Sequence, residues 1–360
     1  MTEREAYVAF NLTDNIGSVG VDRLAERFGG IVAAWENHPA KVARQGGELD
    51  WQSEFAKAKR YGISILTPVD DDYPPTLKNT RGHPLALYVK GSVKALSMPS
   101  VAIVGTRRAT QYGLDQANRF AHDLAQSGWC IVSGLALGVD AEAARGALAA
   151  GGITVGVLGS ALDRFYPDAN RELARTIVKK GGAVVSEFPF GRAPDQQTFP
   201  QRNHVVAALA SGVIAVEAPI KSGTLITAGI AADLGRVVMS VPGRVDAPRS
   251  AGCLKLIRDG ATLVRCAADV AEALGELLPA KKNVKSDAKT VQPPAAPAPA
   301  FSVEESMIMR ELDAAGVSMD KLVELTGLSP QRVRSLTMTL RLKERVRFLP
   351  GNRVALPREF

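Results

Sequence analysis

Short apolar runs alternate with longer amphipathic stretches through the middle of the chain, between residues 101 and 278. The runs are continuously apolar, which is typical of strands that a parallel sheet buries on both faces. Each is followed by roughly 10 to 20 residues, enough for a helix that crosses back over the sheet. The pattern predicts an α/β fold with an extended Rossmann-like, doubly wound parallel sheet. The expected strands are 101–105, 129–134, 153–159, 183–187, 212–218, 237–242 and 261–264.

The two ends of the chain follow a different pattern. The N-terminal region joins amphipathic helical segments through glycine turns such as Gly17-Ser18-Val19-Gly20, which is typical of a SAM-like or helix-hairpin-helix bundle. The C-terminal region opens with a capping box, Ser302 and Glu305, and continues into three helical segments. Two apolar runs around Pro350-Gly351-Asn352 then indicate a hairpin, so this region is predicted to be a winged helix.

Between the sheet and the winged helix, the composition changes to Lys, Pro and Ala without an apolar period, as in an extended linker. The predicted organisation is an N-terminal helical domain over 1–70, a Rossmann-like domain over 71–279, a linker over 280–300 and a winged-helix domain over 301–360.

Composition narrows the class of protein. The 360 residues are 46% hydrophobic and 22% charged, ordinary values for a globular chain. No apolar run reaches the roughly 18 residues of a membrane span, and Met1–Phe10 does not read as a secretory signal. We therefore expect a cytoplasmic protein that makes no membrane contact. Three scattered cysteines and four isolated histidines predict neither a disulfide framework nor a metal site.

The charge points to a polyanionic partner. Basic residues exceed acidic ones by seven, and the pI is about 9.3. Much of the excess lies in residues 332–358, where eight basic residues face one acid. These cations are candidate contacts to duplex DNA, or else the solvated face of a protein-binding module. The candidates are Arg332, Arg334, Arg341, Lys343, Arg345 and Arg347.

Ligands of such sheets bind beyond the carboxyl ends of the strands, so the residues at those ends are the candidate site. The first strand ends in Gly105-Thr106-Arg107-Arg108 without the G-x-G-x-x-G of a dinucleotide fold. The second ends in Ser133-Gly134 without the acid that binds a ribose hydroxyl. We therefore expect no nicotinamide or other cofactor. A glycine turn with a hydroxyl and two guanidinium groups at a helix start favours phosphate oxygens.

Two further strand ends extend this set. After the fourth strand come Phe199, Arg202 and Asn203, an aromatic ring beside a cation and an amide. Such rings stack on unpaired bases while cations bind the backbone of a single strand. After the fifth strand, Lys221-Ser222-Gly223-Thr224 opens a helix and forms a second anion-binding turn.

These residues stand in ordered motifs that resemble the DNA-processing protein A (DprA, also called Smf) family. The motifs span about 190 residues, and the helical N-terminus and the winged helix fit the family too. They are DDYPPTL (71–77), HPLALYVKG (83–91), VAIVGTRRAT (101–110), IVSGLALGVDAEA (131–143), GVLGSALDRFYPDAN (156–170), SEFPFG (186–191), FPQRN (199–203), VEAPIKSGTLITA (216–228), VPG (241–243) and LIRDGA (256–261).

The resemblance implies a cytoplasmic, non-catalytic protein that binds single-stranded DNA, forms a homodimer through the Rossmann-like domain and helps load the RecA recombinase during natural transformation. It also implies a DNA pocket made of the strand-end residues already named. The chain departs from the family pattern at three positions, where Leu137 replaces an arginine, Ala144 a histidine and His204 an arginine. Two lost cations would each remove up to about one counterion from the salt dependence of binding if they contact DNA.

Two other functions stay open. A related Rossmann sheet serves nucleotide phosphoribohydrolases, which place a catalytic carboxylate on the helix start after the fifth strand. Here Thr227 occupies that place, while Glu187 and Glu217 are interpreted as structural carboxylates and Asp140 as a helix-start charge or cap. The winged helix alone would also suit a DNA-binding regulator.

Overall fold

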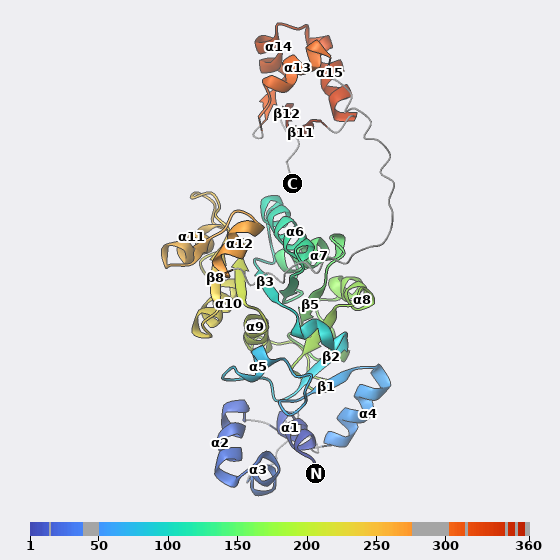
Figure 1. Cartoon of the computed structure of the whole chain (residues 1–360), viewed down its shortest axis with the longest axis vertical. Helices are drawn as coiled ribbons and strands as arrows, with labels where there is room; N and C mark the ends of the chain where they lie inside the picture. Colours follow the sequence, from blue (N-terminus) through green and yellow to red (C-terminus); the bar gives the residue numbers. More distant parts are fainter. Residues whose placement is uncertain are drawn as a thin grey trace. The chain divides into compact units, whose positions relative to one another are not determined.

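The computed structural model describes two compact units, Met1–Asn283 and Val284–Phe360 (Figure 1). The described residues are 1–13, 16–38, 50–275, 302–313, 316–342, 345–349 and 352–356. The predicted linker over 280–300 lies outside them. None of the helices in these ranges is long and apolar enough to cross a membrane.

A nine-stranded sheet in the order β1-β2-β6-β5-β4-β3-β7-β8-β9 forms the centre of the first unit. All seven predicted strands are present, and they pair with one another in parallel. The α/β prediction with a doubly wound parallel sheet is therefore confirmed. The seven strands are β3 (Ser100–Val104), β4 (Cys130–Ser133), β5 (Thr154–Val157), β6 (Ala183–Ser186), β7 (Gly212–Ala215), β8 (Val237–Ser240) and β9 (Thr262–Leu263).

Two antiparallel strands that the apolar pattern did not predict extend the sheet beyond β6. They are β1 (Ser64–Leu66) and β2 (Leu87–Gly91), and β2 pairs with both β1 and β6. The predicted domain boundary at residue 70 falls between these paired strands. Adjacent strands of one sheet thus lie on both sides of that boundary.

Helices cover both faces of the sheet and bury its alternate side chains. On one face, Val205–Ala210 and Ala231 pack on Ala102 and Val104. On the other, Phe120, Leu124 and Ala143 pack on Val101 and Ile103. The helices of this region are α5 (Pro75–Lys78), α6 (Gln111–Gln126), α7 (Val139–Ala149), α8 (Arg171–Lys179), α9 (Thr198–Leu209), α10 (Gly223–Asp233), α11 (Ala251–Arg258) and α12 (Ala267–Ala273), with 3-10 turns at Val93–Ser97, Leu162–Arg164 and Asp168–Asn170.

Four N-terminal helices pack together and against the sheet, as the sequence predicted for a helical N-terminus. Their core includes an edge-to-face pair, Phe10 and Trp35, with ring centroids 5.1 Å apart. The Asn11 amide donates to the carbonyl oxygen of Glu187 at 3.2 Å, which joins this bundle to the end of β6. The helices are α1 (Glu3–Asn11), α2 (Ser18–Phe28), α3 (Ile31–Asn37) and α4 (Trp51–Tyr61).

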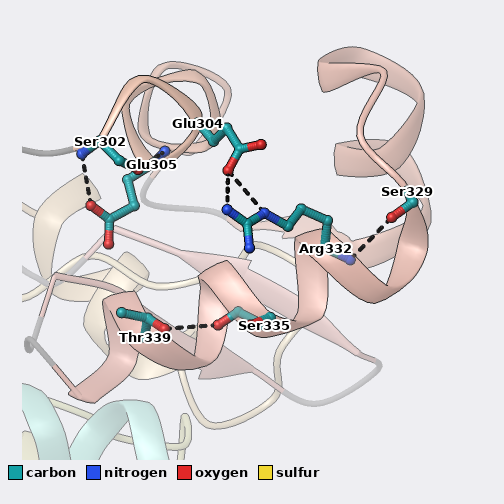
Figure 2. A network of polar contacts seen from close by, with 7 residues as sticks. All are labelled: Ser302, Glu304, Glu305, Ser329, Arg332, Ser335 and Thr339. Carbon is teal, nitrogen blue, oxygen red and sulfur yellow. Dashed lines mark hydrogen bonds and ion pairs between the residues drawn. The ribbon is translucent and has the colours of Figure 1, made fainter.

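The second unit is a winged helix, as predicted. Ser302 and Glu305 form the capping box at its start, and the Arg332 guanidinium donates two hydrogen bonds to the Glu304 carboxylate, linking α13 to α15 (Figure 2). A three-stranded sheet in the order β10-β12-β11 completes it. Its elements are α13 (Val303–Arg310), β10 (Val317–Ser318), α14 (Met319–Thr326), α15 (Pro330–Leu342), β11 (Arg347–Leu349) and β12 (Arg353–Ala355).

Candidate nucleic-acid interface

A pocket of about 340 Å³ opens at the carboxyl ends of β3 and β7. These strands are neighbours in the sheet. After β3 the chain forms β4, β5 and β6 on one side of it, and after α9 it forms β7 and β8 on the other side. The strand order therefore reverses between β3 and β7. Connections that diverge from such a reversal leave a crevice for a ligand. Of the thirteen strand-end residues predicted for the site, twelve line the pocket; Ser133 does not. The Ser133 side chain is fully buried, and its hydroxyl accepts from the backbone N–H of Leu135.

The turn after β3 is fixed by the strand and helix beside it. The Thr106 N–H donates to the carbonyl oxygen of Glu217 at 2.7 Å, and the Val139 N–H donates to the carbonyl oxygen of Thr106. Gly138 has φ +77°, and a Cβ there would lie 2.4 Å from the Thr106 oxygen, so only glycine fits the approach. The backbone around Arg107 is therefore held in place before any ligand binds.

Glu217 joins the two strand ends that form the pocket. Its buried carboxylate accepts from the Thr110 N–H at 2.8 Å and from the Thr110 hydroxyl at 2.6 Å. These contacts tie the start of α6 to the end of β7. Both carboxylate oxygens have structural partners, in agreement with the interpretation of Glu217 as a structural residue.

Asp140 and Arg202 bring two opposite charges beneath the pocket. They are 5% and 6% exposed, and the Arg202 guanidinium donates to the carbonyl oxygens of Gly134 and Val157. Burial raises the pKa of Asp140, against the lowering effect of Arg202 and of backbone N–H groups. Burial lowers the pKa of Arg202 to about 10, which Asp140 partly opposes, so Arg202 stays charged near neutral pH.

Asp140 lies in the first turn of α7, in agreement with its interpretation as a helix-start charge, and Gly138 is the N-cap residue. The Asp140 carboxylate also interacts electrostatically with the Arg202 guanidinium. That guanidinium lies among protein acceptors, in the pocket wall. A Cβ on Gly134 would lie 2.7 Å from both the Asp140 carboxylate and the Arg202 guanidinium. Gly134 therefore lets the two charged groups approach the same stretch of backbone.

Three cations of the pocket remain available to a ligand. Arg107, Arg108 and Lys221 are exposed, and none forms an ion pair with a carboxylate of the described ranges. The Arg107 guanidinium lies over the Phe199 ring, 4.8 Å from its centroid. Unpaired guanidinium and ammonium groups beside a crevice attract phosphate oxygens.

The start of α10 adds backbone donors to these cations. Ser222 is the N-cap residue in an extended conformation, and its side chain makes no capping hydrogen bond. Its buried hydroxyl has no partner in the described part of the chain. The first N–H groups of a helix have no intrahelical acceptor and lie at the positive end of the helix dipole. Ser222, Gly223 and Thr224 thus bring the positive end of α10 and its free N–H donors to the pocket wall.

Two residues outside the predicted site set lie beside the pocket: Tyr166, which sequence reasoning missed, and Leu137, which it named only as a departure from the family pattern. A shallow depression that shares Arg107 and Phe199 with the pocket is also lined by Leu137 and Tyr166. These side chains are 42% and 45% exposed. Tyr166 stands in the sequence motif FYPDAN after β5, but that motif gave no indication that its ring reaches Phe199.

The three departures from the family pattern lie in different surroundings. Ala144 is fully buried among Leu135 and Leu158, so this position lies in the core and faces no ligand. The His204 ring nitrogen lies 3.1 Å from the carbonyl oxygen of Arg81. Leu137 alone of the three borders the site.

The cations predicted on the winged helix lie in the second unit, and several have partners there. Arg332 binds Glu304, Arg341 lies 5.0 Å from the Phe348 ring centroid, and Arg347 donates to the carbonyl oxygen of Leu356. Arg334 and Arg345 are exposed. Lys343 lies outside the described residues.

Removal of one member of the buried charge pair should be costly. We expect Asp140→Ala to lower the free energy of unfolding by about 3 to 5 kcal/mol, because Arg202 is left buried without its counter-charge. The measurement is urea denaturation. Asp168→Ala removes an exposed ion pair with Arg171 and should change stability by less than about 1 kcal/mol. The double variant Asp140→Leu/Arg202→Met should recover most of the loss; similar losses for Asp140→Ala and Asp168→Ala would contradict the assignment.

Comparison with known proteins places the chain in a family. The family model described as DNA recombination-mediator protein A matches residues 64–275, and that of the DprA winged helix domain matches residues 292–352. Protein Smf of Synechocystis is 34% identical, over 77% of this chain and 74% of its own length. DNA processing protein DprA of Bacillus subtilis is 37% identical, over 62% of this chain and 75% of its own length.

Two solved structures are similar as well. DNA processing protein A from Streptococcus pneumoniae is 32% identical with a TM-score of 0.64, over 76% of this chain and 98% of that one. The Helicobacter pylori protein, whose structure was described for its single-stranded DNA binding mode, is 32% identical with a TM-score of 0.53, over 59% of this chain and 95% of that one. Since the first family model spans more than half of the sequence, the chain belongs to the DNA recombination-mediator protein A family, also called DprA or Smf.

Proposed function

We propose that the pocket between β3 and β7 binds the backbone of single-stranded DNA and that the protein acts as a recombination mediator without catalysing a reaction. One observation carries the proposal: unpaired cations, a helix start with free N–H donors and an aromatic ring line one crevice. Phosphate oxygens satisfy the cations and the N–H groups, and unpaired bases stack on rings. The similarity to the Helicobacter pylori protein supports this ligand.

Binding in this mode is tolerant of sequence, because phosphate contacts and stacking distinguish bases poorly. A mediator that protects incoming strands needs such tolerance. We propose that the strand is then passed to the RecA recombinase during natural transformation, a role that fits the family description.

The phosphoribohydrolase alternative lacks its carboxylate. Thr227 stands where that acid would be, and its hydroxyl donates to the carbonyl oxygen of Gly223 at 3.1 Å. Asp140 lines the pocket but lies beside the buried guanidinium of Arg202. No described carboxylate is left over to act as a general base there, which supports a binding protein over an enzyme.

Arg107→Ala and Lys221→Ala should each weaken binding of single-stranded oligonucleotides about tenfold, since a hydrogen bond to a charged group contributes about 1.5 kcal/mol. Each should also reduce the slope of log K against log salt by about 0.7. Fluorescence anisotropy across a salt series measures both quantities.

Arg60→Ala, on the exposed face of α4, serves as the matched control and should leave affinity and slope unchanged. Equal losses for Arg60→Ala and Arg107→Ala would place the strand elsewhere. The same preparation should release no ribose phosphate from nucleoside monophosphates, and release would restore the enzyme alternative.

We also propose that a second copy of the chain packs beside the pocket. Ile220 precedes the Lys221 turn and Ile226 follows it in α10, and these large apolar side chains are 59% and 49% exposed, so a partner could cover both. A homodimer that covers them would bring two pockets near each other along one strand.

Ile226→Glu should convert the dimer to a monomer, because association would bury the new carboxylate against an apolar surface. Sedimentation equilibrium gives the mass directly. Leu263→Glu, at the edge strand β9 with 43% exposure, is the control and should stay dimeric. A wild-type protein that sediments as one chain would refute the dimer.

The winged helix is proposed as a separate contact to duplex DNA or to a protein. Arg334, Met338 and Arg341 share one face of α15, and Met338 is 52% exposed. This face combines cations with an apolar side chain, and so suits either partner.

Deletion of residues 290–360 should leave affinity for single strands within about twofold, because the pocket lies wholly in the first unit. Anisotropy with single- and double-stranded oligonucleotides tests this. Loss of duplex binding alone identifies duplex DNA as the partner of the winged helix, and unchanged duplex binding indicates a protein. Loss of single-strand binding would move the main site to the second unit.

A further inference from the structure

We infer that the surface formed by Tyr166 and Leu137, beside the phosphate pocket, stacks an unpaired nucleobase of the bound strand. The inference rests on the proposed function and adds a base subsite to it. It also assigns the stacking role to Tyr166 and gives Phe199 a supporting one.

The geometry around Phe199 shows which ring is open. The Arg107 guanidinium lies over the Phe199 ring at 4.8 Å, and the Tyr166 ring lies 6.0 Å from it at an angle of 50°. Phe199 thus has a neighbour on each of two sides and is itself only partly exposed. Tyr166 is 45% exposed, and its hydroxyl has no hydrogen bond within the described residues. A base therefore finds a free aromatic surface on Tyr166 without displacing a side chain.

Leu137 adds an apolar contact next to this ring. It lines the same depression as Tyr166 and Pro167 and is 42% exposed. The depression holds only about 20 Å³, so a planar group can lie on it but cannot enter it. An aromatic ring beside aliphatic carbon suits the face of a base.

Tyr166 and Leu137 lie on different loops, and the side chain of Asn170 connects these loops by hydrogen bonds. The buried Asn170 amide donates to the carbonyl oxygens of Leu135 and Ala136 at 2.9 and 3.1 Å. This joins the loop that carries Tyr166 to the loop that carries Leu137. The surface is therefore formed before the strand binds, which reduces the entropy lost on binding.

The position also fits the path of a strand. The depression and the pocket share Arg107, Phe199 and Gly134, so they form one continuous surface. Tyr166 lies one aromatic ring away from the Arg107 guanidinium. A phosphate held by Arg107 thus places a base of the same stretch of strand over Tyr166.

A thermodynamic cycle between the ring and the bases tests the inference. Wild type, Tyr166→Ala and Lys221→Ala are each titrated with an oligonucleotide and with a fully abasic strand of the same length. On the intact strand, Tyr166→Ala should weaken binding about tenfold, the usual effect of one stacked base. On the abasic strand, Tyr166→Ala should bind as tightly as wild type, because no base is left to stack.

Lys221→Ala is the matched control for the proposed phosphate contacts and should weaken binding to both strands. Tyr166→Phe keeps the ring and should restore the affinity for the intact strand. Leu137→Ala should lose affinity on the intact strand alone. Equal losses for Tyr166→Ala on both strands, or none on the intact one, would overturn the base subsite while leaving the phosphate pocket in place. No loss for Lys221→Ala on either strand would instead refute the proposed function.

Discussion

The site depends on one buried interaction, the pairing of the Asp140 and Arg202 charges beneath the pocket. Charges removed from water persist in a fold only when an opposite charge and hydrogen-bond acceptors surround them. Arg202 on α9 donates to carbonyl oxygens at the ends of β4 and β5 and interacts electrostatically with Asp140 on α7, so four elements converge around one guanidinium. This fixes the wall of the crevice and leaves Arg107, Arg108 and Lys221 as the pocket cations available to a ligand.

Much of the fold could be predicted because buried parallel strands are continuously apolar. The strands β1 and β2 were missed since β1 has only three residues and antiparallel edge pairing leaves no such run. Most site residues could be predicted because ligands meet the carboxyl ends of these strands. The sequence does not show which side chains turn inward. Only the three-dimensional structure shows that Ser133 and Arg202 are buried and that Tyr166 is exposed.

In the winged helix, too, the sequence shows where charged residues lie but not which of them are free to bind a partner. Its basic stretch is conspicuous in the sequence, yet Arg332, Arg341 and Arg347 each have a partner within their own unit. The number of cations determines how strongly a domain attracts a polyanion at long range. Recognition at contact depends instead on cations whose hydrogen-bond donors are not already used within the protein. Arg334, on the exposed face of α15, is a clearer candidate for such a contact than Arg332, Arg341 or Arg347.

The stacking of Arg107 on Phe199 has a consequence for how a complex would assemble. A guanidinium that turns toward a phosphate uncovers the ring it had shielded, so arrival of the backbone itself creates fresh aromatic area. On the proposed function, the Arg107 guanidinium covers part of the Phe199 ring while no DNA is bound. The ring becomes accessible for stacking only when a negatively charged ligand draws the guanidinium away.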